Sequence, residues 1–334
     1  MKNPRVSIII PVYNVEDYIE RSVVSLFEQT LEDMEFVFVD DCSPDKSIEI
    51  LCKILLEYPQ RKSQVKIIRH DYNKGVAAAR NTGLKNATGE FIGWVDPDDW
   101  VETDMFAQLY DKAIRNDCDL VWCDIVDEYV RTSQYTNQNA EEKSSILLKK
   151  TLTTLSFGSL CNKLVKHSIY TKNHLWCIDG ANMMEDRILL ARILYFCKVI
   201  KYVPSGFYHY RKEVPKSMTN GGENKGMKHL EESYINLNCL ESFFKEHHVC
   251  EDFAFSCNLL RLIMKQHLLY TTKIEDLKLW ATYQPEANRY VCFSPELRWR
   301  HKCIGMLIYY KLWPIIRFWL YVKQVKSQYI SKKL

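Results

Sequence analysis

A strand, a helix and a second strand follow one another in residues 6–41, which read VSIIIPVYNVEDYIERSVVSLFEQTLEDMEFVFVDD. The run at 6–10 is short, continuous and apolar, which is typical of a buried strand. The next segment has the apolar spacing of one helix face, at Ile19, Val23, Leu26 and Phe27. EFVFV (35–39) then predicts another buried strand. This order indicates a β-α-β unit.

The same alternation continues to residue 95. A helical pattern after Ser43 is followed by VKIIR (65–69), a helix from about Gly75 to Asn86, and EFIGWV (90–95). Strands that alternate with helices need crossover connections, which place the strands side by side in one direction. We therefore predict an α/β fold with a Rossmann-like, doubly wound and mainly parallel sheet. Such sheets bind ligands beyond the carboxyl ends of their strands.

The composition excludes several other classes of protein. With 334 residues and 47% apolar residues, the chain can bury one large core, or a main domain with a smaller partner. The twelve cysteines are scattered without a C-x-x-C pair, so we expect buried thiols in a reducing cytosol rather than disulfides or zinc sites. We expect no secretory signal, because the first apolar run ends at Pro11. Neither G-x-G-x-x-G nor G-x-x-x-x-G-K-[ST] occurs, which argues against dinucleotide and P-loop sites.

The chain changes character near Gly221, beyond which glycine and proline become sparse and helical patterns dominate. We predict a main domain in residues 1–220 and a helical region in 221–334. Residues 296–334 carry nine Lys or Arg against one acid, Glu296. The apolar stretch 304–322 is interrupted by Lys311, Pro314 and Arg317, and each cation at a bilayer centre would cost roughly 2.5 to 3.5 kcal/mol. Two readings stay open: an interfacial membrane helix, or a helix packed on the main domain.

Three acids follow the fourth predicted strand, in Asp96-Pro97-Asp98-Asp99. If the backbone stays extended, Asp96 and Asp98 point to the same side and Asp99 points away. The first two carboxylates could then converge on Mg²⁺ or Mn²⁺, which prefer oxygen ligands and keep positions for phosphate and water. The alternative is a polar turn before the next helix.

Other polar residues lie where a ligand of this edge could reach them. Asp41 follows the second strand and could accept a bond from a nucleobase or ribose, or could cap the next helix. Arg80 lies in a helix of small residues, and could meet a phosphate or remain on the surface. Glu185 and Asp186 precede an apolar run, where acids usually balance a helix dipole; one of them could instead act as a general base.

The motifs together resemble the inverting family 2 glycosyltransferases with the GT-A fold. The resemblance covers roughly residues 4–215 and rests on ordered motifs: VSIIIPVYN, FVFVDDCSPDKS, NKGVAAARNTGLKNATGEFIGWVDPDDW, LCNKLVKHSIY and EDRILLARIL. It implies that Pro11 and Tyr13 frame a nucleobase and that Asp41 contacts it. It also implies that Arg80 approaches the nucleotide.

The same resemblance implies roles around the reaction centre. Asp96 would lie on the ribose or metal side, Asp98 would bind the metal, and Asp186 would be the catalytic base. Family members usually have Ser or Ala where this chain has Pro97, which fixes φ and lacks an N–H. FYHYRKEVPKS (207–217) is similar to the segment that closes over the diphosphate, so His209 and Arg211 are candidates. For His209 the alternative is a sheet histidine whose ring is satisfied by hydrogen bonds within the protein.

The expected activity is transfer of a sugar, with inversion, from a nucleotide diphosphate to a hydroxyl of a glycan or lipid-linked saccharide. A UDP-sugar donor and a Mg²⁺ or Mn²⁺ cofactor follow from the resemblance. We expect a cytoplasmic protein, with peripheral contact to the cytoplasmic membrane face through residues 296–334 as a hypothesis, and no nucleic-acid partner. Two alternatives remain: a nucleotidyltransferase acting on sugar phosphates, and a non-catalytic module that binds nucleotide sugars or glycans.

Overall fold

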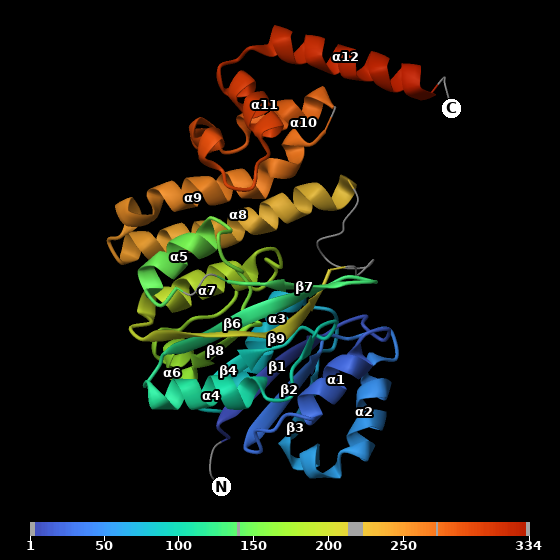
Figure 1. The fold of residues 1–334 in the computed structure, drawn as a ribbon, viewed down its shortest axis with the longest axis vertical. Coiled ribbons are helices and arrows are strands. Elements are labelled where there is room, and N and C mark those ends of the chain that lie inside the picture. The colour runs from blue at the N-terminus through green and yellow to red at the C-terminus, as the bar shows by residue number, and fades with distance from the viewer. Residues whose placement is uncertain (1–3, 139–140, 213–222, 272, 332–334) are drawn as a thin grey trace. The chain divides into compact units, whose positions relative to one another are not determined.

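The computed structural model describes residues 4–138, 141–212, 223–271 and 273–331. The chain forms two compact units (Figure 1). The first contains Met1–Leu148 and Ser156–Leu240, and the second contains Lys149–Leu155 and Glu241–Leu334. The domain boundary predicted at residue 220 lies outside the described residues.

The first unit is built on one mixed sheet that has nine strands within the described residues. Their order is β3-β2-β1-β4-β8-β6-β9-β5, and β7 pairs with β6. The strands are β1 Val6–Val12, β2 Met34–Asp40, β3 Val65–Arg69, β4 Phe91–Trp94, β5 Trp100–Val101, β6 Leu120–Glu128, β7 Ser133–Thr136, β8 Lys163–Lys166 and β9 Ile200–Arg211.

The predicted α/β class is confirmed, and the four strands expected before residue 95 are all present and parallel. In the other half of the sheet, the strands run in both directions. β8 runs antiparallel to both β4 and β6, and β5 and β7 are antiparallel to β9 and β6. Only β6 and β9 add a further parallel pair in the part that the structure describes.

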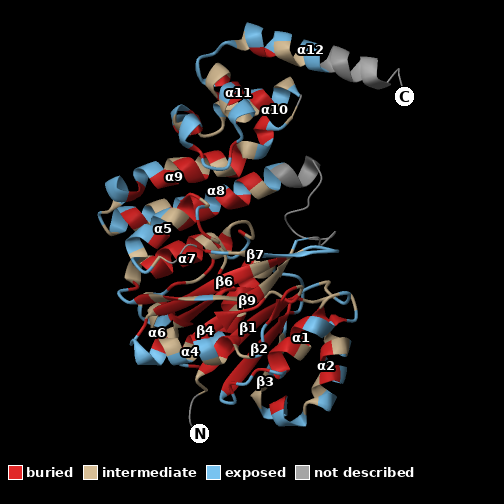
Figure 2. Cartoon of the chain, viewed as in Figure 1, coloured by how far each residue is buried: buried red, intermediate tan, exposed pale blue. Residues whose placement is uncertain are grey.

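Helices cover both faces of this sheet. Val6, Ile8 and Ile10 of β1 share one apolar core with side chains of α1 and α4, whereas Ile9 points to the other face, against Gly83 of α3. β1, β2 and β4 are wholly buried between these layers, whereas β3 and β7 are largely exposed (Figure 2). The helices of the first unit include α1 Ile19–Phe27, α2 Ser47–Glu57, α3 Val76–Asn86, α4 Met105–Arg115, α6 His167–Lys172, α7 Glu185–Phe196 and the part of α8 (Glu223–Glu246) up to Leu240.

The second unit is helical, as predicted for the carboxyl-terminal region. Its centre includes Lys265, whose buried ammonium group donates to three backbone carbonyls and to Asn288. No helix among the described residues is both long and apolar enough to cross a bilayer. The elements beyond α8 are α9 Cys250–Lys265, α10 Ile274–Thr282, α11 Trp299–Tyr309 and α12 Trp313–Ser331, with 3₁₀ helices at Gln266–Leu269 and Pro285–Phe293.

Candidate active site

The carboxyl ends of β1, β2 and β4 lie side by side, because β1 pairs with β2 on one side and with β4 on the other. This is the point where the strand order reverses, which is where open α/β sheets bind ligands. Tyr13, Asp41 and Asp96 follow these three strand ends. The predicted convergence of these residues at one edge therefore agrees with the topology. Pro11 lies one residue before the end of β1, where it is buried and pairs with Val39 of β2. Tyr13, which follows the strand, is 46% exposed.

Asp41 anchors the segment that leads into α3. One carboxylate oxygen accepts bonds from His70 Nδ1 at 2.7 Å and from the Lys74 N–H at 2.8 Å. The other accepts the Gly75 N–H at 2.8 Å. Gly75 has φ +89°, and a Cβ atom there would lie 2.4 Å from Asn182 Oδ1, so this position requires glycine. The structure thus gives Asp41 a positioning role, and its nucleobase contact stays a prediction.

Arg80 of α3 is a buried link between two of the predicted acids. Its guanidinium donates to Asp96 at 2.9 Å and also to Glu185 of α7. Burial alone would lower the pKa of Arg80, but the charges of Glu185 and Asp96 raise it well above the usual value. The alternative of a surface arginine is wrong, since Arg80 is only 5% exposed. Arg80 therefore holds Asp96 and α7 at a fixed separation.

Residues 96–99 form a tight turn rather than the extended segment that we expected. The Asp99 N–H donates to the Asp96 carbonyl at 3.0 Å. Asp99, which we expected to point away from Asp96, is buried near it, and its carboxylate accepts bonds from the Tyr208 hydroxyl at 2.6 Å and the Arg211 N–H at 2.8 Å. Among the described residues, only the backbone N–H of Asp98 itself donates a hydrogen bond to the Asp98 carboxylate. Burial and the nearby charge of Asp96 raise the pKa of Asp98 to about 6.

These groups suit a hard divalent cation. Ligand atoms of Asp96, Asp99 and Cys161 lie within 4.8 Å of one another, but both oxygens of Asp99 are already hydrogen-bonded. Burial raises the pKa of the Cys161 thiol well above its usual value, which disfavours the thiolate that soft metals need. Asp98, half-buried and close to the charge of Asp96, is left as the available carboxylate. A cation there would offset the repulsion between the two acids.

The two candidates of β9 have different environments. Arg211 Nε donates to the Asp98 carbonyl at 3.0 Å, so this side chain lies against the turn. His209 instead has both ring nitrogens next to carboxylates, Glu128 at 2.7 Å and Glu102 at 2.8 Å. It also stacks on Trp100 with ring centroids 5.1 Å apart. This geometry matches the alternative of a satisfied sheet histidine, and contact with a ligand stays a prediction.

The acid pair lies in the first turn of α7. Glu185 is buried against Arg80, and burial raises its pKa above the usual range. Asp186 is half-buried, with one oxygen 2.6 Å from the Arg187 N–H. The charge of Asp186 acts on both Arg80 and Lys163. Asp186 is thus the more accessible acid of the pair, next to the Glu185 that Arg80 links to Asp96.

Lys163 is a member of this region that the sequence analysis missed. It is 1% exposed, and its ammonium group donates to the carbonyls of Phe157 and Ser159 and to Asn162 Oδ1, at 2.6 to 3.0 Å. Burial lowers its pKa to about 8. These bonds fix residues 157–162, which bring the Cys161 sulfur to 3.7 Å from Asp96. In the sequence, Lys163 was marked only by its place in the motif LCNKLVKHSIY (160–170), where it is the first residue of β8.

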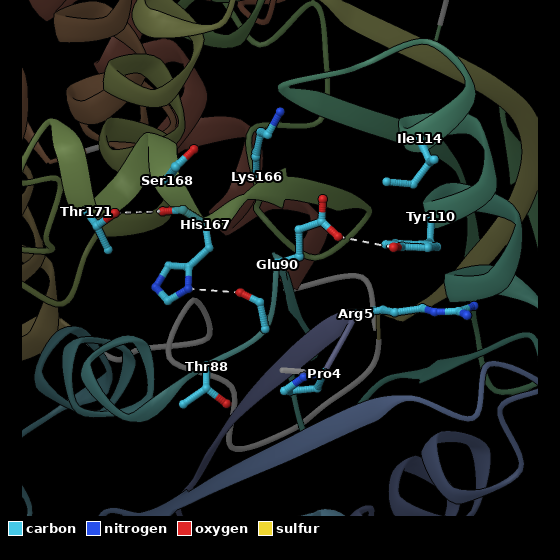
Figure 3. A pocket seen from close by; sticks show the side chains of 11 residues that line it. Pro4, Arg5, Thr88, Glu90, Tyr110, Ile114, Lys166, His167, Ser168 and Thr171 are labelled. Carbon is cyan, nitrogen blue, oxygen red and sulfur yellow. Dashed lines mark hydrogen bonds between the residues drawn. The ribbon is translucent and has the colours of Figure 1, made fainter. Parts of the chain in front are cut away.

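A separate hollow of about 950 Å³ lies at the opposite edge of the sheet (Figure 3). Its walls come from the amino ends of β1 and β4 and from α4 and α6. Figure 3 shows its polar groups bonded to one another: Tyr110 donates to Glu90 at 3.1 Å, and His167 lies 3.0 Å from the Gly89 carbonyl. None of the predicted site residues lines it.

The comparisons with known proteins agree on one protein family for this chain. Residues 7–173 match the model of glycosyl transferase family 2. The uncharacterized glycosyltransferase EpsJ of Bacillus subtilis strain 168 is 32% identical over 240 residues, which are 69% of this chain and 68% of EpsJ. The glycosyltransferase GlyA of Streptococcus pneumoniae is 40% identical over 223 residues, which are 62% of this chain but only 30% of GlyA.

Among solved structures, residues 1–349 of Staphylococcus aureus TarS in complex with UDP-GlcNAc superpose with a TM-score of 0.67. The match covers 97% of this chain and 92% of that one at 19% identity, so it establishes the fold, GT-A with carboxyl-terminal helices. From the family match and the EpsJ alignment together, we conclude that this chain belongs to glycosyl transferase family 2.

Proposed function

We propose that this glycosyltransferase moves a sugar from a nucleotide diphosphate, a UDP-sugar, onto a hydroxyl acceptor by single displacement with inversion. The observation that carries the proposal is the available Asp98 carboxylate beside Asp96, joined through Arg80 to the acid pair of α7. This arrangement combines an anchor for a charged leaving group with a nearby proton acceptor.

The donor would occupy the edge formed by β1, β2 and β4. Pro11 and Tyr13 would frame the nucleobase, and Asp41 would accept its N–H group. The exposed ring of Tyr13 and the rigid segment held by Asp41 support this assignment. Arg211 lies against the Asp98 carbonyl, where its guanidinium could meet the diphosphate. His209 belongs to the same segment, residues 207–217, which we propose closes over the diphosphate.

Asp98, with Asp96, would hold Mg²⁺ or Mn²⁺. When bound, such an ion neutralises the negative charge that the departing diphosphate develops. The donor set supports this assignment, since Asp98 offers free oxygen ligands close to a second carboxylate. A protein of similar fold, the mannosyltransferase PcManGT from Pyrobaculum calidifontis, was solved with GDP-Man and Mn²⁺; it superposes on this chain with a TM-score of 0.53 at 15% identity.

Asp186 would take the proton of the acceptor hydroxyl. As the acceptor oxygen bonds to the anomeric carbon, the bond from that carbon to the diphosphate oxygen breaks on the opposite face, which inverts the configuration. General-base assistance of this kind contributes about 10² to 10⁴ in rate. Glu185, engaged with Arg80, would orient α7 and leave Asp186 as the proton acceptor.

A panel of nucleotide sugars with Mn²⁺ tests this function. We expect slow hydrolysis of at least one of them to release its nucleoside diphosphate, and chelation by EDTA to stop the release. Pyrophosphate released from a nucleoside triphosphate and a sugar phosphate would instead identify a nucleotidyltransferase. Binding without any turnover would identify the non-catalytic module.

The acceptor would be a glycan or a lipid-linked saccharide. Relatives of this chain include the minor teichoic acid biosynthesis protein GgaB of Bacillus subtilis, at 31% identity, and the cholesterol galactosyltransferase of Borreliella burgdorferi, at 26%. We place the enzyme in the cytoplasm, in peripheral contact with the membrane. This contact is supported by exposed aromatic side chains of α11, α12 and the turn between them, because cations alternate with these side chains along the sequence. The aromatic residues are Trp299, Tyr310, Phe318 and Tyr321.

Replacing Phe318 and Tyr321 by Ser should therefore weaken binding to lipid vesicles that contain phosphatidylglycerol. Phe318 is 68% exposed and Tyr321 is 64% exposed, so the change removes surface apolar area rather than core packing. We expect flotation with vesicles to fall several-fold. Leu56→Ser, at a 79% exposed position of α2, is the control. Equal flotation of the double variant and the unaltered chain would rule out this membrane contact.

A further inference from the structure

The loop that precedes α7 is held by two buried polar residues of α8. Asn236 Nδ2 donates to the Ala181 carbonyl at 2.9 Å and to the Met183 carbonyl at 2.8 Å. One carboxylate oxygen of Glu232 accepts the Asn182 N–H at 3.1 Å. Asn236 is 1% exposed and Glu232 is 6% exposed. Two peptide groups before α7, those of residues 181–182 and 183–184, are thus bonded to one helix.

This loop needs external support because its last residue is strained. Met184 has φ 64°, in the left-handed region that residues with a side chain seldom adopt. Its carbonyl accepts the first hydrogen bond of α7, from the Ile188 N–H at 3.0 Å. Such conformations persist only where the surroundings hold them, and they are enriched at functional sites. Asn236 holds the peptide directly before Met184, and Asp186 follows two residues later.

The same loop also touches the donor side of the site. Asn182 Oδ1 accepts the Ala77 N–H at 3.1 Å, at the amino end of α3. Its side chain packs on Gly75, whose N–H binds Asp41. The loop therefore stands between α8, the amino end of α3 and the acid pair, and a shift of the loop would move Asp186 relative to the bound donor.

We propose that Glu232 and Asn236 are positioning residues for the reaction, which set the place of Asp186 through the loop 181–184. The proposal rests on the function above, in which Asp186 takes the acceptor proton. Ordinary packing of α8 is the alternative, and it predicts lower stability without a specific loss of turnover.

Asn236→Leu keeps a similar volume but removes both donated bonds. We expect kcat for transfer to fall at least 10-fold, with the Kd for UDP in the presence of Mn²⁺ unchanged within about 2-fold. Asn238→Leu is the matched control, since Asn238 is exposed on the same helix. Glu232→Gln keeps an oxygen acceptor and should retain kcat, whereas Glu232→Leu should lose it. This second pair keeps the test valid if Asn236→Leu does not fold.

A double-mutant cycle with Asp186→Asn separates positioning from packing. If Asn236 acts through Asp186, adding Asn236→Leu to Asp186→Asn lowers kcat by less than about 2-fold further. Losses that multiply in the double variant would overturn the proposal, as would an unchanged kcat in both Asn236→Leu and Glu232→Leu. If Asp186→Asn alone keeps full turnover, the choice of base is wrong and this inference fails with it; a failure confined to the α8 variants leaves the proposed function intact.

Discussion

Asp98→Ala is expected to abolish the Mn²⁺-dependent part of UDP binding and to lower transfer by more than about 100-fold. Among the described residues, the Asp98 carboxylate accepts a hydrogen bond only from its own backbone N–H, so its loss removes a ligand of the cation and deprives no other side chain of a hydrogen-bond partner. Isothermal titration of UDP with and without Mn²⁺ measures the effect on binding, and a transfer assay measures the effect on turnover.

Asp98→Ala should leave the fold intact, which makes the result easy to interpret. Burial and Asp96 raise the pKa of Asp98 to about 6 in the folded protein, above the usual value for an aspartate. At neutral pH the ionised group is therefore disfavoured by folding, and its removal takes no stability away. Asp111→Ala, on the exposed face of α4, is the control. Equal Mn²⁺ dependence in Asp98→Ala and the unaltered chain would contradict the metal assignment.

Asp186→Asn is expected to lower kcat by about 10² to 10⁴ while the Kd of the donor stays within about 2-fold. Asparagine has the same shape and keeps an oxygen for the Arg187 N–H, so the start of α7 should persist. What disappears is the charge that accepts the proton. Asp252→Asn, in the exposed first turn of α9, provides the control.

Parallel transfer and calorimetry measurements on Asp186→Asn decide between two outcomes. Loss of turnover with retained donor affinity supports Asp186 as the base. Undiminished turnover would mean that another group accepts the proton, and loss of donor affinity would mean that Asp186 binds the donor instead.

Most strands that could be predicted from the sequence are buried on both faces, and the mostly exposed edge strand β3 is the exception. β1, β2 and β4 are continuous apolar runs, and their burial by helices on both sides makes such runs necessary. β5 has two residues and β8 has four, so neither shows a periodicity of its own. Their place depends on pairing with β9 and with β4 and β6, which local sequence does not encode.

The positions of the acids were predictable, but their partners were not. Strand ends identify Asp41 and Asp96 because parallel strands share an edge. The bond between Arg80 and Glu185 joins residues 105 positions apart, and only the fold brings them together. The backbone at Pro97 turns where we expected extension, so the sequence analysis paired Asp96 and Asp98 for an incorrect geometric reason.

For Glu232 and Asn236 of α8 as well, the sequence indicates burial but not the bonding partners. Glu232 and Asn236 lie on a buried face with Leu237 and Leu240, so polar residues among apolar spacing were a usable signal. Nothing in that pattern indicates which carbonyls they bind, since Ala181 and Met183 lie more than 50 residues earlier.

In the proposed function, a divalent cation and a nucleotide diphosphate meet at Asp98. Crystals soaked with UDP and Mn²⁺, with diffraction measured at the manganese absorption edge, test it most directly. We predict an anomalous peak about 2.1 Å from an Asp98 carboxylate oxygen, with the uracil ring between Tyr13 and Asp41. A manganese peak away from Asp98, or UDP bound at another part of the surface, would contradict the account.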